Sequence, residues 1–276
     1  KEIGLTKPLS IINKKDLLLF QISLQREIQQ GNKVAFYGIS LVAQAIKVEH
    51  ALTLLETQGI KQLDAYYKKL QGEETKAAKV ILNEKEIQKA IQLTKELIEK
   101  NIQHPKLTKL KEIVEDELKH NTKTKFIIFA NYRFTVKEIY DTFKEKEYAN
   151  PVMLVGQKEG LTQKQQFRVI QDFSEGKYNI LIGTSITEEG LDIPGGAELA
   201  IFYEPIPSEI RSIQRKGRVG RIKIGKILFL ITKGTKDEAF YWSAFHKEKK
   251  MKKILYGMQK IYRDKIEKQK TLKEVS

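Results

Sequence analysis

Apolar residues in the first 120 positions recur three and four residues apart, the spacing of one face of an α-helix. Asn13, followed by Asp16 in the next turn, predicts a helix start, and Gly31 predicts the end of that helix. The same pattern predicts further helices over 33–58, 63–70, 75–100 and 106–119. No strand-like alternation interrupts them. We therefore predict an all-helical bundle domain over residues 1–120, with a connector at its beginning.

After residue 121 the pattern changes to short apolar runs separated by amphipathic segments. Five predicted strands are FIIFA, VMLV, YNILIG, ELAIFYE and KILFLIT. Thr162 and Gln165 form a capping-box pattern at the start of one intervening helix. Strands that alternate with helices indicate a parallel sheet. The predicted fold class is α/β: a parallel sheet with flanking helices over 121–248, preceded by the bundle and followed by a basic helix or tail over 249–276.

Composition places the chain among water-soluble globular proteins with a polyanionic partner. Its 276 residues correspond to about two domains, and 41% of them are hydrophobic. No apolar run of membrane-spanning length occurs, so we expect no membrane partner and an intracellular, cytoplasmic and nucleoid-associated location. The absence of cysteine excludes disulfides and thiolate-bound metals. The net charge of +15 favours nucleic acid as the partner, although lysine-rich surfaces alone would also produce it.

One stretch, QRKGRVGR over 214–221, combines four cations with two glycines. Glycine disfavours a solvated helix but allows backbone to pass close to a ligand. The arginine fork matches phosphate oxygens, and Arg218 and Arg221 would share one helix face. The stretch therefore predicts a polyphosphate-binding device. A basic nucleic-acid patch or a localisation signal is the alternative interpretation.

A second cluster lies upstream, where the run YNILIG ends in the small hydroxyls of Thr184 and Ser185. The sequence EEGLDIP follows, and it places an acid beside a glycine in a turn. This order of elements indicates a nucleoside-triphosphatase arrangement: a strand, a hydroxyl loop, an acid–glycine turn, a second strand, a helix and the arginine cluster.

These two clusters resemble motifs of the second RecA-like domain of superfamily 2 helicases. GTSITEEGLDIP is similar to motif V of that family, and QRKGRVGR is similar to motif VI. The finer resemblance is to the archaeal Hef and Fanconi anaemia M type of DNA helicase. It rests on HALTLLETQGI, KFIIFANYRFTVKEI, VGQ, LTQKQQ and KGTKDEAFYWSAFHKEKKM. In that family a helical domain is inserted between two RecA-like halves and is linked to branched DNA.

The resemblance implies roles for particular residues. Arg218 and Arg221 would be arginine fingers, Gln214 would sense the γ-phosphate, and Gly190 and Asp192 would line the nucleotide cleft. The predicted contacts to the nucleic-acid backbone are Asn131, Arg133, Gln157, Gln163, Lys164, Thr184 and Ser185. For three of these residues a non-functional interpretation is the alternative. Asp192 would be an ordinary carboxylate in a turn, Asn131 a turn residue and Arg133 a solvated side chain.

The phosphate-binding loop G-x-x-x-x-G-K-[ST] does not occur, and the Asp116–Glu117 pair lies in a charged helical pattern rather than after a strand. We therefore expect a piece or remnant of a larger helicase. ATP and Mg²⁺ would serve the complete protein, whose N-terminal RecA-like domain would be a partner of this chain. The chain alone should bind ATP weakly and not hydrolyse it, while it binds branched or single-stranded DNA.

Two other functions stay open. A non-catalytic module could bind nucleic acid through the bundle and the tail, and a part of an RNA helicase or RNA sensor would share this motif set. The four histidines have no partners at metal-ligand spacing, so no metal site is predicted. The aromatic residues near Trp242 predict either packing against the sheet or stacking on bases, and packing is favoured.

Overall fold

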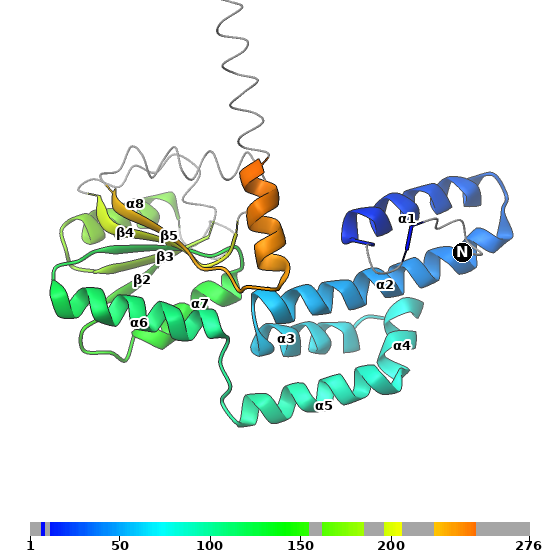
Figure 1. Ribbon diagram of the computed structural model, residues 1–276, viewed down its shortest axis with the longest axis horizontal. Coiled ribbons are helices and arrows are strands. Elements are labelled where there is room, and N and C mark those ends of the chain that lie inside the picture. Colours follow the sequence, from blue (N-terminus) through cyan, green and yellow to red (C-terminus); the bar gives the residue numbers. More distant parts are fainter. Residues whose placement is uncertain (1–6, 9–11, 155–161, 185–195, 206–223, 247–276) are drawn as a thin grey trace, which may run out of the picture. The chain divides into compact units, whose positions relative to one another are not determined.

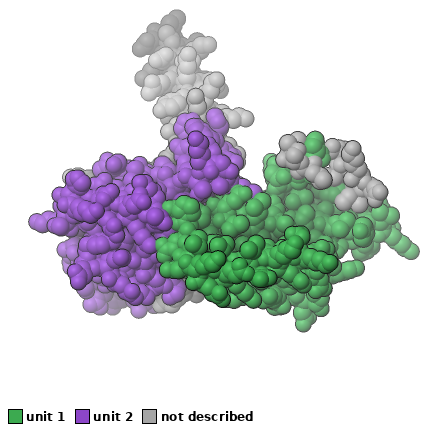
Figure 2. All heavy atoms as spheres, turned by 60° about the horizontal axis from the view of Figure 1, so that its bottom comes forward, with its two compact units in different colours: residues 1–105 green, residues 106–276 purple. Residues whose placement is uncertain are grey.

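The computed structural model describes residues 7–8, 12–154, 162–184, 196–205 and 224–246. The chain divides into two compact units, which are coloured separately in Figure 2. We call residues 1–105 the helical unit and residues 106–276 the α/β unit.

The helical unit contains five helices in its described residues. They are α1 (Lys14–Gln29), α2 (Lys33–Thr57), α3 (Ile60–Gln71), α4 (Lys76–Asn83) and α5 (Lys85–Glu99). The predicted start of α1 is confirmed, because Asn13 and Asp16 form a reciprocal capping box. Gly59 separates α2 from α3 with a φ of 100°, and a Cβ there would lie 3.0 Å from the Cβ of His104. Only glycine fits that position without strain.

The helix predicted over 75–100 is two helices. Glu84 has extended backbone angles and serves both as the C-cap of α4 and as the N-cap of α5. Ile81 is buried in α4, and the next apolar residue in α5, Ile87, is not on the same helical face. A break at Glu84 lets both residues turn toward the interior, which a continuous helix of 3.6 residues per turn would not allow.

Two small apolar clusters form the interior of the helical unit. Leu17, Leu24 and Val42 belong to the cluster between α1 and α2. Leu63 and Leu70 belong to the cluster that α3 shares with α2 and α4. By length and composition α2 is apolar enough to cross a membrane, and 22% of its most apolar window is buried; a single helix of this kind is weak evidence of a membrane span. Moreover, α2 contributes buried residues to both clusters.

The α/β unit includes α6 (Pro105–His120) from its second residue onward, and it contains a five-stranded parallel sheet (Figure 1). The strands are β1 (Phe126–Phe129), β2 (Pro151–Leu154), β3 (Ile180–Gly183), β4 (Ala197–Phe202) and β5 (Ile224–Phe229). Their order is β2-β3-β1-β4-β5, and every pairing is parallel. The helices α7 (Arg133–Phe143) and α8 (Gln163–Ser174) connect β1 to β2 and β2 to β3. The predicted fold class is therefore confirmed.

Helices cover both faces of this sheet. Phe126 and Ile128 of β1 pack on one face in a cluster with residues of α6 and α7. Ile127 and Phe129 pack on the other face with residues of α8. Each of the four β1 side chains is at most 5% exposed. A central strand covered on both faces has this continuous apolar run rather than an alternating one.

The helix α6 belongs to the α/β unit, which differs from the predicted boundary at residue 120. Its Leu107, Leu110, Val114 and Leu118 share the cluster of β1 and α7. The apolar face of α6 is thus buried against the sheet, so the units meet in sequence at Pro105. Helical periodicity predicted the helix correctly but carries no information on which neighbour covers its face.

An aromatic row spans the neighbouring strands β1, β4 and β5 and continues into the helical residues 236–246. The rings of Phe129, Phe202 and Phe229 stack across neighbouring strands, with centroids 4.9 and 4.8 Å apart. Tyr241 meets Phe229 edge-on at 5.8 Å. Trp242 is nevertheless 48% exposed, so packing on the sheet applies to Tyr241 but not to the whole aromatic group.

Candidate nucleic-acid interface at the carboxyl edge of the sheet

The candidate site lies where the parallel strands end. All strands of a parallel sheet finish at the same edge, and ligands of open α/β sheets bind in the loops there. Residues 130–133 follow β1, Thr184 follows β3, residues 203–205 follow β4, and residues 230–235 follow β5. The loop after β2, which contains the predicted contact Gln157, lies outside the described residues.

Two of the predicted contacts lie on neighbouring strands. Phe129 is in register with Gly183, so Asn131 and Thr184 begin adjacent loops. The ladder continues past the strands, because the N–H of Ala130 donates to the carbonyl of Gly183 over 3.0 Å. Asn131 is half-buried and the side chain of Thr184 is buried. The residues that carry this amide and this hydroxyl therefore follow two neighbouring strands near the centre of the edge.

Glu204 fixes the loop that carries Asn131. Its Oε2 accepts the backbone N–H of Asn131 over 2.7 Å, although only 3% of Glu204 is exposed. A hydrogen bond to a carboxylate is stronger than one between neutral groups, so the start of this loop is well determined. The carboxylate also acts on Tyr132: burial, and then the charge of Glu204, raise the pKa of its phenol.

The remaining described contacts lie at helix starts. Arg133 is the first residue of α7 and is exposed. Gln163 and Lys164 are the first residues of α8 and are also exposed. The predicted capping box before them is confirmed, since Gln165 N–H donates to Thr162 Oγ1 and Thr162 N–H donates to Gln165 Oε1. Because α8 follows β2, it starts at the same edge as Asn131, but β3 separates β2 from β1.

The predicted nucleotide contacts, and the predicted nucleic-acid contact Ser185, are not part of this geometry. Ser185, Gly190, Asp192, Gln214, Arg218 and Arg221 all lie outside the described residues. Within the described ranges, no group of three or more His, Asp or Glu side chains could hold a metal ion. The ring of His104 lies 3.1 Å from the carbonyl of Glu56 through Nε2, and His50 meets Tyr66 edge-on.

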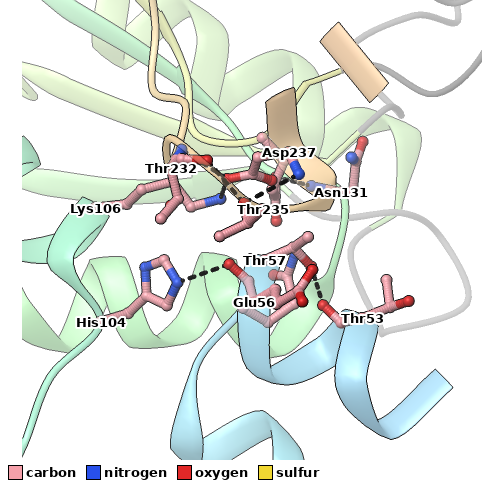
Figure 3. A network of polar contacts seen from close by, with 11 residues as sticks. Thr53, Glu56, Thr57, His104, Lys106, Asn131, Thr232, Thr235 and Asp237 are labelled. Carbon is pink, nitrogen blue, oxygen red and sulfur yellow. Dashed lines mark hydrogen bonds and ion pairs between the residues drawn. The ribbon is translucent and has the colours of Figure 1, made fainter. Parts of the chain in front are cut away.

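Sequence reasoning missed three charged residues beneath this edge. Lys106 Nζ lies 2.8 Å from Asp237 Oδ2, and their side chains are 3% and 0% exposed (Figure 3). Glu204 is the third. Its position directly after an apolar strand was a usable signal, since a carboxylate there needs a donor when it is buried. Lys106 gave no signal, because lysine is frequent throughout this chain.

Tyr203 lies next to Lys106. Its ring centroid is 5.0 Å from Lys106 Nζ, and its side chain is fully buried. Burial raises its pKa far above the usual range, and the charges of Glu138, Glu204 and Asp237 raise it further. The phenol is therefore neutral under all ordinary conditions and faces the lysine with its ring.

Two protein families match the chain. Residues 105–223 match the helicase conserved C-terminal domain, and residues 1–104 match the helical bundle of a candidate ATP-dependent RNA helicase. The change from one family to the other falls at the same place as the division between the two units.

Relatives and a solved structure agree with these matches. A candidate ATP-dependent RNA helicase of Methanocaldococcus jannaschii is 37% identical over 94% of this chain and 32% of its own length. An ATP-dependent DNA helicase of Pyricularia oryzae is 33% identical over 83% of this chain and 22% of its own. The crystal structure of the Pyrococcus furiosus Hef helicase domain superposes with a TM-score of 0.71 at 42% identity, covering 85% of this chain and 49% of that one.

This chain spans less than half the length of each of these proteins. The matches therefore identify domains and fold, and they do not extend to a complete enzyme. The chain is a helical bundle followed by the conserved C-terminal domain of a helicase, in the RecA-like fold of superfamily 2.

Proposed function

We propose that this chain is the C-terminal part of an ATP-dependent helicase or translocase that acts on DNA, with branched or forked DNA as its substrate. It would supply the arginine fingers and half of the track along which the strand moves. The half that binds the phosphates of ATP and the Mg²⁺ ion would come from a preceding RecA-like domain of the same protein.

The observation that carries the proposal is the carboxyl edge of the sheet. Asn131 and Thr184 begin adjacent loops there, within a region that matches a helicase domain. Amide and hydroxyl groups bind phosphate oxygens without reading base sequence. The exposed Arg133 would add charge at the start of α7. Such contacts hold a strand at any position, which a moving enzyme requires.

Nucleotide chemistry would depend on residues 185–221. Arg218 and Arg221 would stabilise the charge that develops on the γ-phosphate, Gln214 would contact that phosphate, and Gly190 and Asp192 would line the cleft. ATP supplies the cleavable phosphoanhydride bond when it is bound. Arginine fingers contribute about 10³- to 10⁵-fold in rate in related phosphoryl transfers.

The decisive experiment is DNA-stimulated ATPase measured in a protein that joins this chain to the helicase half preceding it in its relatives. We expect Arg218→Ala and Arg221→Ala each to lower turnover by about 10³-fold or more. Arg168→Ala, which changes an exposed arginine of α8, is the control and should leave turnover unchanged. Turnover that survives both finger substitutions would remove the proposed role of these arginines.

The chain by itself gives a second test. We expect it to bind forked DNA without hydrolysing ATP. Binding should weaken between about 50 and 200 mM salt, because each phosphate contact releases bound counterions. Salt-independent binding would contradict the phosphate contacts, and ATP turnover by the chain alone would reveal a nucleotide site within it.

RNA is the second candidate substrate, because one of the relatives and the helical-bundle family are described as RNA helicases. The fungal relative is described as a DNA helicase. Stimulation of ATPase by forked DNA and by double-stranded RNA of equal length separates the two. Stronger stimulation by RNA would show that RNA, and not DNA, is the substrate.

A further inference from the structure

The ion pair of Lys106 and Asp237 is buried beneath the candidate interface, and neither residue has a role in the proposed function. The distance from Nζ to Oδ2 is 2.8 Å, and the side chains are 3% and 0% exposed. The Lys47–Glu73 pair of the helical unit, by contrast, keeps 20% and 27% of its side chains exposed. Removing two charges from water costs several kcal/mol for each ion, so such a pair is weak evidence for stability. The burial of this ion pair therefore needs an explanation other than stability.

The carboxylate of Asp237 organises the loop after β5 (Figure 3). Its Oδ2 accepts the N–H of Thr232 over 3.2 Å. The hydroxyl of Thr235 donates to the carbonyl of Thr232 over 2.7 Å, and it accepts the N–H of Asp237 over 3.2 Å. Residues 232–237 thus form a hydrogen-bonded loop, and the carboxylate of Asp237 in this loop pairs with Lys106.

Lys106 also reaches the loop after β4. Its Nζ lies 5.0 Å from the ring centroid of Tyr203, a distance at which a cation is attracted to an aromatic face. The next residue, Glu204, accepts the N–H of Asn131. The ends of three neighbouring strands, β5, β4 and β1, are therefore connected through one buried lysine in the first turn of α6.

We propose that Lys106 and Asp237 are positioning residues for the nucleic-acid-binding edge. The pair sets where the loops after β4 and β5 leave the sheet, and through Glu204 it sets the loop that carries Asn131. Neither residue touches the ligand. This inference rests on the proposed function, and it assigns a role to the sequence KGTKDEAF, which the proposed nucleotide and nucleic-acid contacts leave unexplained.

A neutral replacement of the whole pair separates positioning from folding. Lys106→Met keeps the stem of the side chain, and Asp237→Asn keeps an acceptor for the Thr232 N–H. Each single variant leaves one buried partner uncompensated, so we expect a clear fall in the urea midpoint of unfolding. The double variant should recover most of that midpoint, because buried ion pairs are replaced by neutral groups at little cost.

The readouts for the double variant are hydrogen exchange and DNA binding by the full chain. We expect faster exchange at the amide of Asn131 and in residues 230–237 while the strands stay protected. The affinity for a short fluorescent single-stranded DNA should fall about tenfold, the loss expected for one to two phosphate hydrogen bonds. The slope of log affinity against log salt should drop by about 0.7 for each phosphate that the displaced loops no longer neutralise.

A matched control removes an ion pair elsewhere. Lys47→Met with Glu73→Gln makes the same change in charge in the helical unit, where the pair is partly exposed. It should leave exchange at Asn131 and the salt slope unchanged. A Lys106→Met, Asp237→Asn chain that folds normally and shows unchanged exchange at Asn131 would overturn the inference, whether or not DNA binds. Altered exchange without any DNA binding by the unchanged chain would instead overturn the proposed function alone.

Discussion

The two units bury their apolar side chains in different ways. In the α/β unit one cluster brings together buried residues of two helices and several strands, and all its β1 residues are fully buried. In the helical unit the clusters are small, and large apolar side chains such as Phe36 and Tyr37 are more than half exposed. The sheet needs both faces covered, whereas a helical hairpin needs only one stripe.

Charged groups follow the same division. The α/β unit buries a lysine and two carboxylates beneath its loops, each at most 3% exposed. The helical unit keeps ion pairs such as Lys89–Glu86 at its surface. A rigid, dry interior can hold charges in one geometry, and a shallow helical interior cannot. We therefore expect function at the sheet edge to depend on a precise interior, and the helical unit to tolerate more change.

The largest expected effect is in the central strand. Ile128→Ala should cost about 2–5 kcal/mol of unfolding free energy, because the cavity is enclosed on all sides. Ile22→Ala in α1, where the side chain is 47% exposed, should change stability by less than about 0.5 kcal/mol. Urea unfolding of both variants measures the difference. Equal losses would remove the contrast between the units.

A substitution inside the helical unit tests whether the units are independent. Leu24→Ala removes a side chain that is 2% exposed and should cost about 2–3 kcal/mol. The loss should appear as faster hydrogen exchange in α1 and α2, which pack on each other, while the strands stay protected. If the strands exchange faster as well, the two units unfold together and are not independent.

Helix caps offer a smaller test with matched chemistry in both units. Asn13 caps α1 and Thr162 caps α8, and each belongs to a capping box. Replacement of either by alanine should cost about 1 kcal/mol. We expect the Thr162→Ala loss to be accompanied by weaker DNA binding, since Gln163 and Lys164 follow that cap, whereas Asn13→Ala should affect stability alone. A fluorescence binding titration distinguishes the two.

The smallest effect is confined to alkaline pH. Burial, and then the charges of Glu73 and Tyr67, raise the pKa of Tyr66 to about 12. An unfolded tyrosine ionises near pH 10, so the contribution of Tyr66 to stability is complete below pH 10 and is lost as the pH rises through about 12. Absorbance titration of the chain and of Tyr66→Phe should differ by one late-titrating phenol.

Tyr203 should ionise only on unfolding, and its early titration would show an open sheet edge.

Most elements could be predicted from the sequence because their signals are local. The Asn13 and Thr162 capping boxes each need only four residues, and the apolar strands are continuous runs. The break at Glu84 was missed because periodicity was averaged over a long segment. The assignment of α6 to the α/β unit was missed because burial of Leu110 depends on strands that follow later in the chain.

The candidate site was predictable only in part for a similar reason. Loops after strands are visible in the sequence, so Asn131 and Thr184 could be named. The residues that support these loops could not be named, because Glu204 and Asp237 contact residues that are far from them in the sequence. The sequence alone does not distinguish a buried lysine from a solvated one. The predictions for Gln214, Arg218 and Arg221 stay predictions.

The strand order has a consequence for the synthesis of this protein. The central strand β1 leaves the ribosome before either of its neighbours, because Phe126 pairs with Ile180 on one side and with Leu199 on the other. Until β3 and β4 emerge, an apolar strand with two unpaired edges is exposed to self-association. Lys123 and Lys125 stand directly before it, where charge opposes such pairing. Nascent chains truncated between β1 and β4 should therefore aggregate, and full-length chains should not.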